Sequence, residues 1–382
     1  MTNISTSNGM NARLTSIDSS FCGHRAILAE DSFQRMISLE RKRTERSHKP
    51  FILMLLDTAG FLSREKNSKI LHRLLTALSS ATRETDITGW YKTHCVVGVM
   101  FTEISITDKT VILSTMLGRI NQALRDELTL EQFSHINIAF HVYPEDWDQD
   151  GDGRPSNPTL YPDLLRRDQS QKFKRLVKRL MDVVGSLFAL MVLFPLFVII
   201  AAAIRLSSPG PVLFRQRRLG RHGLPFQLLK FRSMHADSDP AIHKEYVTKL
   251  VTGTANRQPT NGNSEGVYKL TSDPRVTRIG SLLRRSSLDE LPQLINVLKG
   301  EMSLVGPRPP LPYEVEAYDL WHRRRILEAM PGITGLWQVN GRNRVNFDDM
   351  VRLDLIYATT WTPWLDLKIL LLTPIAVIEG AH

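Results

Sequence analysis

Cysteine is almost absent from this 382-residue sequence, which contains only Cys22 and Cys95. Two isolated cysteines are too few for a disulfide framework or a zinc site, and their scarcity suits a reducing compartment. The first thirty residues also lack the basic start and apolar core of a secretory signal peptide. We therefore expect a cytoplasmic protein, or one that reaches a membrane from the cytoplasmic side.

Acidic residues are fewer than basic ones, 39 against 49, which leaves a net charge of +10. Such an excess favours anionic partners such as lipid headgroups, phosphorylated substrates or nucleic acid. Charge alone does not choose among these partners. The length is sufficient for two ordinary domains, each with its own core.

One long segment carries no charge at all. Residues 183–204 read VVGSLFALMVLFPLFVIIAAAI, which exceeds the roughly 20 residues that a helix needs to span a bilayer. The alternative is a buried core helix of a soluble protein, but such a helix is rarely apolar on every face for so long. The segment predicts a membrane helix, which nucleic-acid binding would not explain.

Basic residues flank this segment on both sides. The flanking cations are Lys172, Lys174, Arg175, Lys178 and Arg179 before it, and Arg205, Arg215, Arg217, Arg218 and Arg221 after it. Because the positive-inside rule keeps such flanks cytoplasmic, a simple span would place one of them on the wrong side. Pro195 near the midpoint favours a sharp bend. We expect a re-entrant helix hairpin; a proline-kinked spanning helix is the alternative.

Two adjacent acids, Asp289 and Glu290, precede a run with helical spacing of leucine and isoleucine. Because Pro292 is tolerated only in a first turn, the helix should begin close to Asp289. The simplest interpretation is capping, since Ser287-x-x-Glu290 matches a capping box.

Several arginines accompany the two acids along the chain. These are Arg275, Arg278, Arg284 and Arg285 upstream and Arg308 downstream. Arginine binds phosphate oxygens in a bidentate manner, and two acids among arginines can hold a divalent metal and attack phosphorus. The alternative for the arginines is a membrane-surface patch.

Three motifs follow the basic-flanked apolar segment in order. They are KFRSM at 230–234, SLDELPQLINVLKGEMSLVGPRP at 287–309 and PGITGLWQVNGRN at 331–343. Together they closely resemble the bacterial sugar transferase family, the monotopic phosphoglycosyl transferases, whose long-chain members initiate exopolysaccharide, capsule or O-antigen synthesis. The resemblance covers residues 172–382, and motifs of this length and order are highly specific.

The resemblance implies transfer of a sugar 1-phosphate from a UDP-sugar to polyprenyl (undecaprenyl) phosphate, with Mg²⁺ as cofactor. The first acid of the pair would be a nucleophile that expels UMP and forms a covalent aspartyl-phosphosugar intermediate, and the second would bind magnesium. The residues matched to family roles are Asp289, Glu290 and Lys230 as catalytic groups, Glu290 as the metal ligand, and Arg284, Arg308 and Arg342 as substrate-binding groups.

The resemblance also implies membrane lipids as partners and a place in the inner (cytoplasmic) membrane, with the catalytic domain on the cytoplasmic face. We expect UDP-glucose or UDP-galactose as donor and no nucleic acid as partner, and we leave a homodimer open. Two alternatives remain: a catalytically idle membrane adaptor or signal-sensing protein of polysaccharide assembly, and a nucleotide-signalling enzyme.

The N-terminal half alternates strand-like and helical patterns. Strands are predicted at 51–56, 95–101 and 136–142 and helices at 68–83 and 111–124, which gives the order β-α-β-α-β. This half resembles a ferredoxin-like domain of the GGDEF type. Residues 92–95 read KTHC where that motif would stand, and Asp57 alone cannot assemble a two-metal site. The resemblance therefore implies a degenerate regulatory or dimerisation module.

The predicted fold class is α+β. Residues 1–45 form a disordered polar N-terminus, 46–145 the degenerate GGDEF-like domain, 146–171 a linker, and 172–382 a mainly helical transferase domain with a small β-hairpin around residues 220–223. We expect 236–266 to be a surface insertion or a mobile loop, and 365–377 to be either an interfacial helix or a core helix.

Overall fold

The computed structural model describes residues 27–58, 68–104, 109–145, 157–170, 172–234, 241–254, 258–260, 263–267, 275–341 and 345–379. The chain divides into two compact units. Unit 1 contains residues 1–44 and 48–143, and unit 2 contains residues 45–47 and 144–382.

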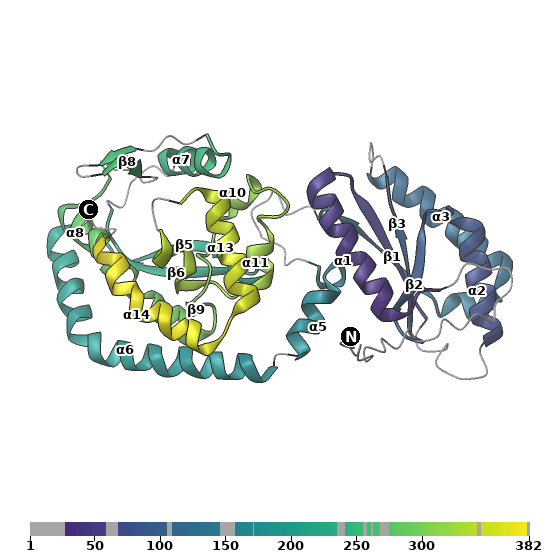
Figure 1. Cartoon of the computed structure of the whole chain (residues 1–382), viewed down its shortest axis with the longest axis horizontal. Helices are drawn as coiled ribbons and strands as arrows, with labels where there is room; N and C mark the ends of the chain where they lie inside the picture. The colour runs from purple at the N-terminus through teal and green to yellow at the C-terminus, as the bar shows by residue number, and fades with distance from the viewer. Residues whose placement is uncertain are drawn as a thin grey trace, which may run out of the picture. The chain divides into compact units, whose positions relative to one another are not determined.

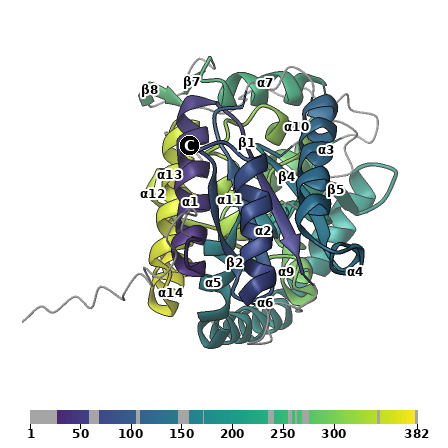
Figure 2. The ribbon, with the colours of Figure 1, turned by 90° about the vertical axis from the view of Figure 1, so that its right-hand side faces the viewer.

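Unit 1 is built on a four-stranded antiparallel sheet with the strand order β2-β3-β1-β4. The strands are β1 (Phe51–Asp57), β2 (Ile87–Lys92), β3 (Val96–Phe101) and β4 (Asn137–Tyr143). The helices are α1 (Glu30–Ser47), α2 (Ser68–Ala81), α3 (Lys109–Glu127) and α4 (Leu130–Ser134). Helix α1 covers one face of the sheet and α2 and α3 the other (Figure 1). Helices α2 and α3 lie side by side (Figure 2).

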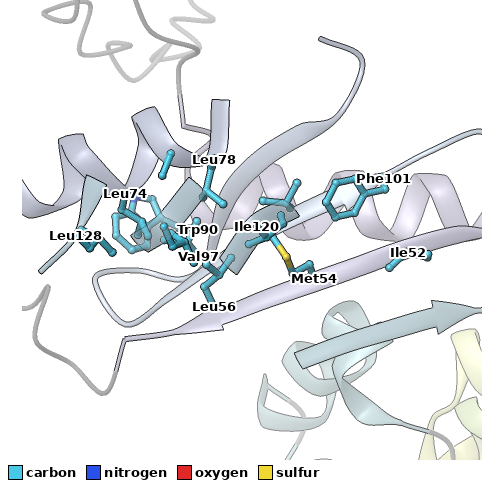
Figure 3. Packing of buried hydrophobic residues seen from close by; sticks show 13 residues of the cluster. Ile52, Met54, Leu56, Leu74, Leu78, Trp90, Val97, Phe101, Ile120 and Leu128 are labelled. Atoms are coloured by element: carbon cyan, nitrogen blue, oxygen red, sulfur yellow. The ribbon is translucent and has the colours of Figure 1, made fainter. Parts of the chain in front are cut away.

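The main core of unit 1 lies between the sheet and helices α2 and α3. Alternate residues of β1, namely Ile52, Met54 and Leu56, join Leu74 of α2 and Ile120 of α3 in one buried cluster (Figure 3). Because α1 covers the opposite face, the first six residues of β1 are all buried. This explains why β1 reads as a continuous apolar run rather than an alternating one.

A pair of glycines makes room for α1 on its face of the sheet. Gly89 of β2 and Gly98 of β3 are cross-strand partners. A Cβ added at either glycine would overlap the ring of Phe33, which is fully buried. The missing side chains therefore form the hollow into which α1 inserts its aromatic ring.

Two features of unit 1 differ from the sequence prediction. Strand β2 was not predicted, so the order of strands and long helices that follows α1 is β-α-β-β-α-β within an α+β unit. The predicted disorder of 1–45 is wrong for α1, because Phe33 and Ile37 bury one side of this otherwise polar helix. Residues 1–26 lie outside the described part of the chain.

Unit 2 is mainly helical, as predicted. Its helices are α5 (Pro162–Ser170), α6 (Lys172–Ser207), α7 (Ala241–Val251), α8 (Arg278–Arg285), α9 (Gln293–Lys299), α10 (Pro312–Glu316), α11 (Arg324–Glu328), α12 (Leu336–Asn340), α13 (Phe347–Thr360) and α14 (Pro363–Glu379), with single 3₁₀ turns η3 (Pro158–Leu160), η4 (Arg221–Gly223) and η5 (Leu288–Glu290). Three strand pairs complete it: β5 (Leu213–Leu219) with β6 (Pro225–Phe231), β7 (Gln258–Thr260) with β8 (Asn263–Val267), and β9 (Ser303–Val305) with β10 (Gly332–Thr334). The predicted β-hairpin is confirmed as β5–β6, which turns through η4.

Helix α6 contains the charge-free segment. It is long and apolar enough to cross a membrane, and its most apolar stretch is little buried. The side chains of Phe188, Met191 and Phe194 are each more than 60% exposed. This exposure excludes the core-helix alternative, because a core helix would bury these groups.

The predicted helix-break-helix hairpin is not confirmed as two separate helices. The helix assignment is continuous through Pro195, and the ribbon bends sharply about two thirds of the way along (Figure 1). Proline removes one backbone hydrogen bond and clashes with the preceding turn, which bends a helix without ending it.

Both ends of α6 are attached to unit 2. Near its start, the Asp182 carboxylate accepts hydrogen bonds from the Ser303 hydroxyl and the Leu304 N–H, each at 2.9 Å. Near its end, Ile200 and Ile204 pack in one buried cluster with Phe231 of β6. Between the fully buried Ser186 and Phe197, whose ring lies 5.3 Å from that of Phe231, residues 187–196 form an apolar excursion of about 15 Å along the helix axis.

Two predictions about connecting segments are also corrected. The predicted linker 146–171 contains η3 and α5, and Leu160 and Tyr161 are buried there; residues 146–156 and 171 lie outside the described part. The predicted surface insertion 236–266 contains α7, whose Val247 and Val251 belong to a buried cluster. Both segments are polar overall, so their few apolar residues at helical spacing did not predict a helix.

Candidate active site

The acid pair lies in the short turn η5, directly before α9. Helix α9 begins at Gln293, later than the predicted start near Asp289. Ser287 has left-handed backbone angles, φ 56° and ψ 18°, instead of the extended conformation of an N-cap residue. The capping interpretation of Ser287 and Glu290 is therefore wrong for this turn. A left-handed residue with a side chain is uncommon, and such residues are enriched at active sites.

Asp289 is the more buried of the two acids, with 8% of its surface exposed. Burial raises the pKa of its carboxyl to about 6. The positive charges of Lys230 and Arg284 lower this pKa, whereas the negative charge of Glu290 raises it further. A carboxyl with this pKa is still mostly ionised at pH 7. It is therefore a desolvated anion held next to cations, which is the environment that activates a carboxylate nucleophile.

Lys230 and Glu290 form a close ion pair at the mouth of the site. The Lys230 Nζ donates to the Glu290 Oε1 at 2.7 Å, and the two side chains are 20% and 32% exposed. Lys230 comes from β6, so the predicted hairpin carries it to η5 across 60 residues of sequence. The structure thus brings together all three residues that the sequence predicted as catalytic.

The predicted substrate-binding arginines lie around this centre. Arg284, in the last turn of α8, is exposed and acts electrostatically on Asp289. Arg308 is exposed and follows β9. Burial lowers the pKa of Arg218 to about 10; Arg308 contributes to this shift, while Glu290 is among the acids that oppose it. Arg218 is therefore within electrostatic range of both Arg308 and the acid pair. Arg342 lies outside the described residues.

Two buried arginines hold the loop that carries Arg308. Arg218 donates from its NH1 to the Pro309 carbonyl oxygen at 2.8 Å, and Arg325 donates from its NH2 to the Arg308 carbonyl oxygen at 3.3 Å. Arg325 is itself paired with Asp354 at 2.7 Å. The sequence analysis assigned Arg218 to the membrane flank and did not single out Arg325, because nothing local distinguishes a loop-supporting arginine from a surface one.

The motif that carries Arg308 also packs on the third motif. Strands β9 and β10 pair in parallel, and the Gly306 N–H donates to the Thr334 carbonyl oxygen at 2.8 Å. A Cβ on Gly306 would overlap the backbone of Met330. The glycine is required here by close backbone approach, so two motifs that are separated in sequence form one loop platform.

Helix α9 is fixed at its C-terminal end by α6. Arg179 of α6 donates from NH1 to the Val297 carbonyl oxygen at 2.6 Å and from NH2 to the Leu298 carbonyl oxygen at 2.7 Å. A cation at a helix C-terminus is favoured by the helix dipole. Arg179 was predicted only as part of a basic flank, yet it connects α6 to the helix that follows the acid pair.

Asn296 fixes the same helix to the strand of Lys230. It is fully buried; its Oδ1 accepts from the Leu229 N–H at 3.0 Å, and its Nδ2 donates to the Gln227 carbonyl oxygen at 2.7 Å. The side chain thus bonds β6 close to Lys230. The sequence analysis counted this position only as part of a helical run.

The residues present fit a magnesium ion that is bound partly by protein carboxylates and partly by a substrate phosphate. Among the described residues, no three His, Cys, Asp or Glu side chains cluster into an all-protein metal site. Mg²⁺ is usually bound by one or two carboxylates together with substrate phosphates and water. Asp289 and Glu290 supply two adjacent carboxylates, and the second is partly exposed.

Comparison with known proteins shows the family of the chain. The family model described as "Bacterial sugar transferase" matches residues 173–380, which is more than half of the chain. The chain therefore belongs to the bacterial sugar transferase family.

Two relatives illustrate the similarity. The chain is 42% identical over 211 residues to the galactosyl transferase CpsE of Streptococcus agalactiae serotype III (strain NEM316), covering 55% of this chain and 44% of that protein. It is 40% identical over 222 residues to the undecaprenyl-phosphate galactose phosphotransferase of Salmonella typhimurium, covering 57% and 44%. The chain thus spans less than half the length of these curated relatives.

The solved structures give a weaker comparison. A DGC protein from Thermotoga maritima shares 22% identity and a TM-score of 0.25, covering 31% of this chain and 84% of that one. A likeness at that score carries no argument. The degenerate GGDEF-like character of unit 1 therefore stays a sequence-based prediction.

Proposed function

We propose that the chain transfers a sugar 1-phosphate from a UDP-sugar to polyprenyl phosphate, with Asp289 as the nucleophile. The observation that carries this proposal is the buried Asp289 beside the 2.7 Å Lys230–Glu290 pair, within a shell of arginines. The names of the relatives support the same reaction class. The idle-adaptor alternative gains no support from this arrangement, since the three charged groups are in position together.

The reaction divides into two displacements at one phosphorus atom. The ionised Asp289 attacks the phosphorus that carries the sugar; an Asp289 O–P bond forms, and the P–O bond to UMP breaks. An oxygen of the acceptor phosphate then attacks the same phosphorus, and Asp289 leaves as a carboxylate. Because the donor's nucleotide leaves before the lipid reacts, the kinetics should be ping-pong.

Charge neutralisation is the main contribution of the surrounding residues. A carboxylate and a diphosphate repel each other, so Lys230, Arg284 and Arg308 lower the barrier by stabilising phosphate oxygens. Glu290, oriented by Lys230, would hold Mg²⁺, which when bound neutralises phosphate charge. Burial of Asp289 keeps water from competing for the phosphorus.

We also propose that α6 is re-entrant and that unit 2 lies on the cytoplasmic face of the inner membrane. A helix that crosses a bilayer places its ends on opposite sides, whereas both ends of α6 are attached to the same unit. The apolar excursion with its bend at Pro195 therefore enters and returns. Helix α14 fits an interfacial position, with Asp366 and Ile369 buried and Trp364 and Leu371 exposed.

The activity is tested with detergent-solubilised full-length protein, Mg²⁺, polyprenyl phosphate and radiolabelled UDP-galactose or UDP-glucose. We expect label in the lipid phase and UMP release, both abolished by Asp289→Asn. Asp349→Asn, which changes a surface carboxylate of α13, is the matched control and should retain activity. Full activity of Asp289→Asn, or no lipid labelling by any UDP-hexose, would contradict the proposal.

Topology has a separate test. In a background without Cys22 and Cys95, single cysteines at the exposed positions Lys174 and Arg215 should both react with an impermeant reagent only from the cytoplasmic side. A spanning helix would expose the two positions on opposite sides. Cross-linking of the same preparation in detergent tests whether the chain is a homodimer.

A further inference from the structure

A cavity of about 720 Å³ lies beside the acid pair in unit 2. Leu288, Glu290 and Leu291, which stand within two residues of Asp289 in the sequence, line it. The last part of α14, including Ala376 and Val377, lines it as well. The volume lies within the range of about 300–1,000 Å³ that is typical of sites for small molecules.

The wall of this cavity is mostly apolar. Leu282 and Leu294 contribute from α8 and α9, and Ile333 from β10. The hydroxyls of Thr334 and Thr373 bond each other at 2.8 Å, and the Thr373 hydroxyl also donates to the Ile369 carbonyl oxygen at 2.7 Å, so both hydroxyl hydrogens are used within the protein. Such a wall suits a hydrocarbon chain and offers little to the hydroxyls of a sugar or a ribose.

The cavity opens to the apolar exterior of the unit. Leu282 and Ile378 both line it, yet they are 67% and 66% exposed, so they form its rim. The neighbouring exposed residue Ile375 of α14 continues the apolar surface outside. One cation, Arg285, also lines the cavity, close in sequence to the acids. The cavity therefore connects an apolar surface with a charged reaction centre.

We propose that this cavity binds the first isoprene units of the polyprenyl phosphate acceptor, with the acceptor's phosphate beside Glu290 and Arg285. This inference rests on the proposed function. The occupant has to combine a hydrocarbon chain with a phosphate that reaches the phosphorus on Asp289, and the acceptor has both. The UDP-sugar donor lacks the chain, and a bilayer lipid has no role at the nucleophile.

If the acceptor binds in this cavity, α14 is needed only for the second displacement, in which the acceptor phosphate attacks. UMP release requires the donor, Asp289 and its cations, whereas lipid product also requires an acceptor chain lying against α14. Val377→Trp fills the cavity with a larger side chain. We expect it to raise the KM for polyprenyl phosphate at least tenfold while the rate of UMP release without acceptor stays within twofold of the parent protein.

Leu371→Trp is the matched control, because Leu371 lies on the same helix and is 67% exposed on its apolar outer side. It should leave both the acceptor KM and UMP release unchanged. An unchanged acceptor KM in Val377→Trp, with the parent enzyme active, would overturn the cavity assignment and leave the proposed function intact. If the parent enzyme labels no lipid with any UDP-hexose, the proposed function itself fails.

A binding measurement keeps the inference testable when Val377→Trp folds poorly. In the background without Cys22 and Cys95, Ala376→Cys is treated with N-ethylmaleimide. Polyprenyl phosphate should slow its modification at least fivefold, whereas UDP-hexose and vesicles of phosphatidylglycerol should not. Equal protection by the vesicles, or protection by UDP-hexose alone, would overturn the proposal, because the cavity would then hold a bilayer lipid or the donor.

Discussion

Arg179 offers a direct test of whether α6 positions the active site. Its guanidinium donates two hydrogen bonds, at 2.6 and 2.7 Å, to the last carbonyls of α9. Arg179→Gln removes the charge and at least one of these bonds. A hydrogen bond from a charged group contributes about 1.5–3 kcal/mol, and a cation at a helix C-terminus adds about 0.3–1 kcal/mol. Since Arg179 is only partly buried, we expect a loss of about 2–3 kcal/mol.

The loss should be visible both in stability and in rate. For a unit of this size, about 2–3 kcal/mol corresponds to a fall of roughly 5–10 °C in the unfolding midpoint in detergent. The rate of UMP release should also fall, because α9 is the helix that follows the acid pair and bonds the strand of Lys230 through Asn296. Differential scanning fluorimetry and a coupled UMP assay measure the two effects.

Arg205→Gln is the control for the Arg179 prediction. Arg205 lies near the other end of α6, is exposed, and donates to the nearby Gly210 carbonyl oxygen at 3.0 Å. The same chemical change there should cost less than about 1 kcal/mol. Equal destabilisation by the two substitutions, or a normal rate of UMP release in Arg179→Gln, would refute the reasoning.

Three further predictions concern the acid pair, its support and unit 1. Because the pKa of Asp289 is raised to about 6, UMP release measured at low Mg²⁺ should fall as pH drops through about 6; a rate that is flat down to pH 5 would contradict this. Asn296→Ala leaves buried backbone groups of β6 without their partners, so chemical denaturation should show a loss of about 2–4 kcal/mol together with slower UMP release, and an unchanged rate would disprove its positioning role. Gly98→Val should destabilise unit 1 by about 1–3 kcal/mol through overlap with Phe33, whereas Gly118→Ala, which meets nothing within 4 Å, should be neutral or slightly stabilising in the same thermal scan.

Strong periodic signals in the sequence predicted the elements that the structure contains. The charge-free run predicted α6, the alternation around residues 220–223 predicted β5–β6, and the apolar run at 51–56 predicted β1. Helix α1 escaped prediction because charged residues cover most of it and only one narrow side is buried. Strand β2 was not predicted because Gly89 has no side chain to contribute to a strand pattern. The space that Gly89 leaves for the ring of Phe33 exists only in the folded sheet.

The active site was predicted in part, and mainly through family resemblance. The order and length of the three motifs indicated Lys230, Asp289 and Glu290, which the structure brings together. Charge pattern could not separate cations with different roles. Arg179 and Arg218 both stand in basic flanks of an apolar segment, yet one binds the end of α9 and the other holds a loop from within the core. Only tertiary contacts distinguish such residues from those that meet lipid headgroups.

The attachment of α6 at both ends has a consequence for how the protein responds to its bilayer. A spanning helix must match the full hydrocarbon thickness, and mismatch tilts it. On the proposed topology, α6 samples a single leaflet, and its bond to α9 through Arg179 makes the height of Asp289 above the acyl chains a property of that leaflet alone. The lipid composition of the inner leaflet would then alter the rate of catalysis by changing the depth of Asp289. The composition of the opposite leaflet would have no such effect.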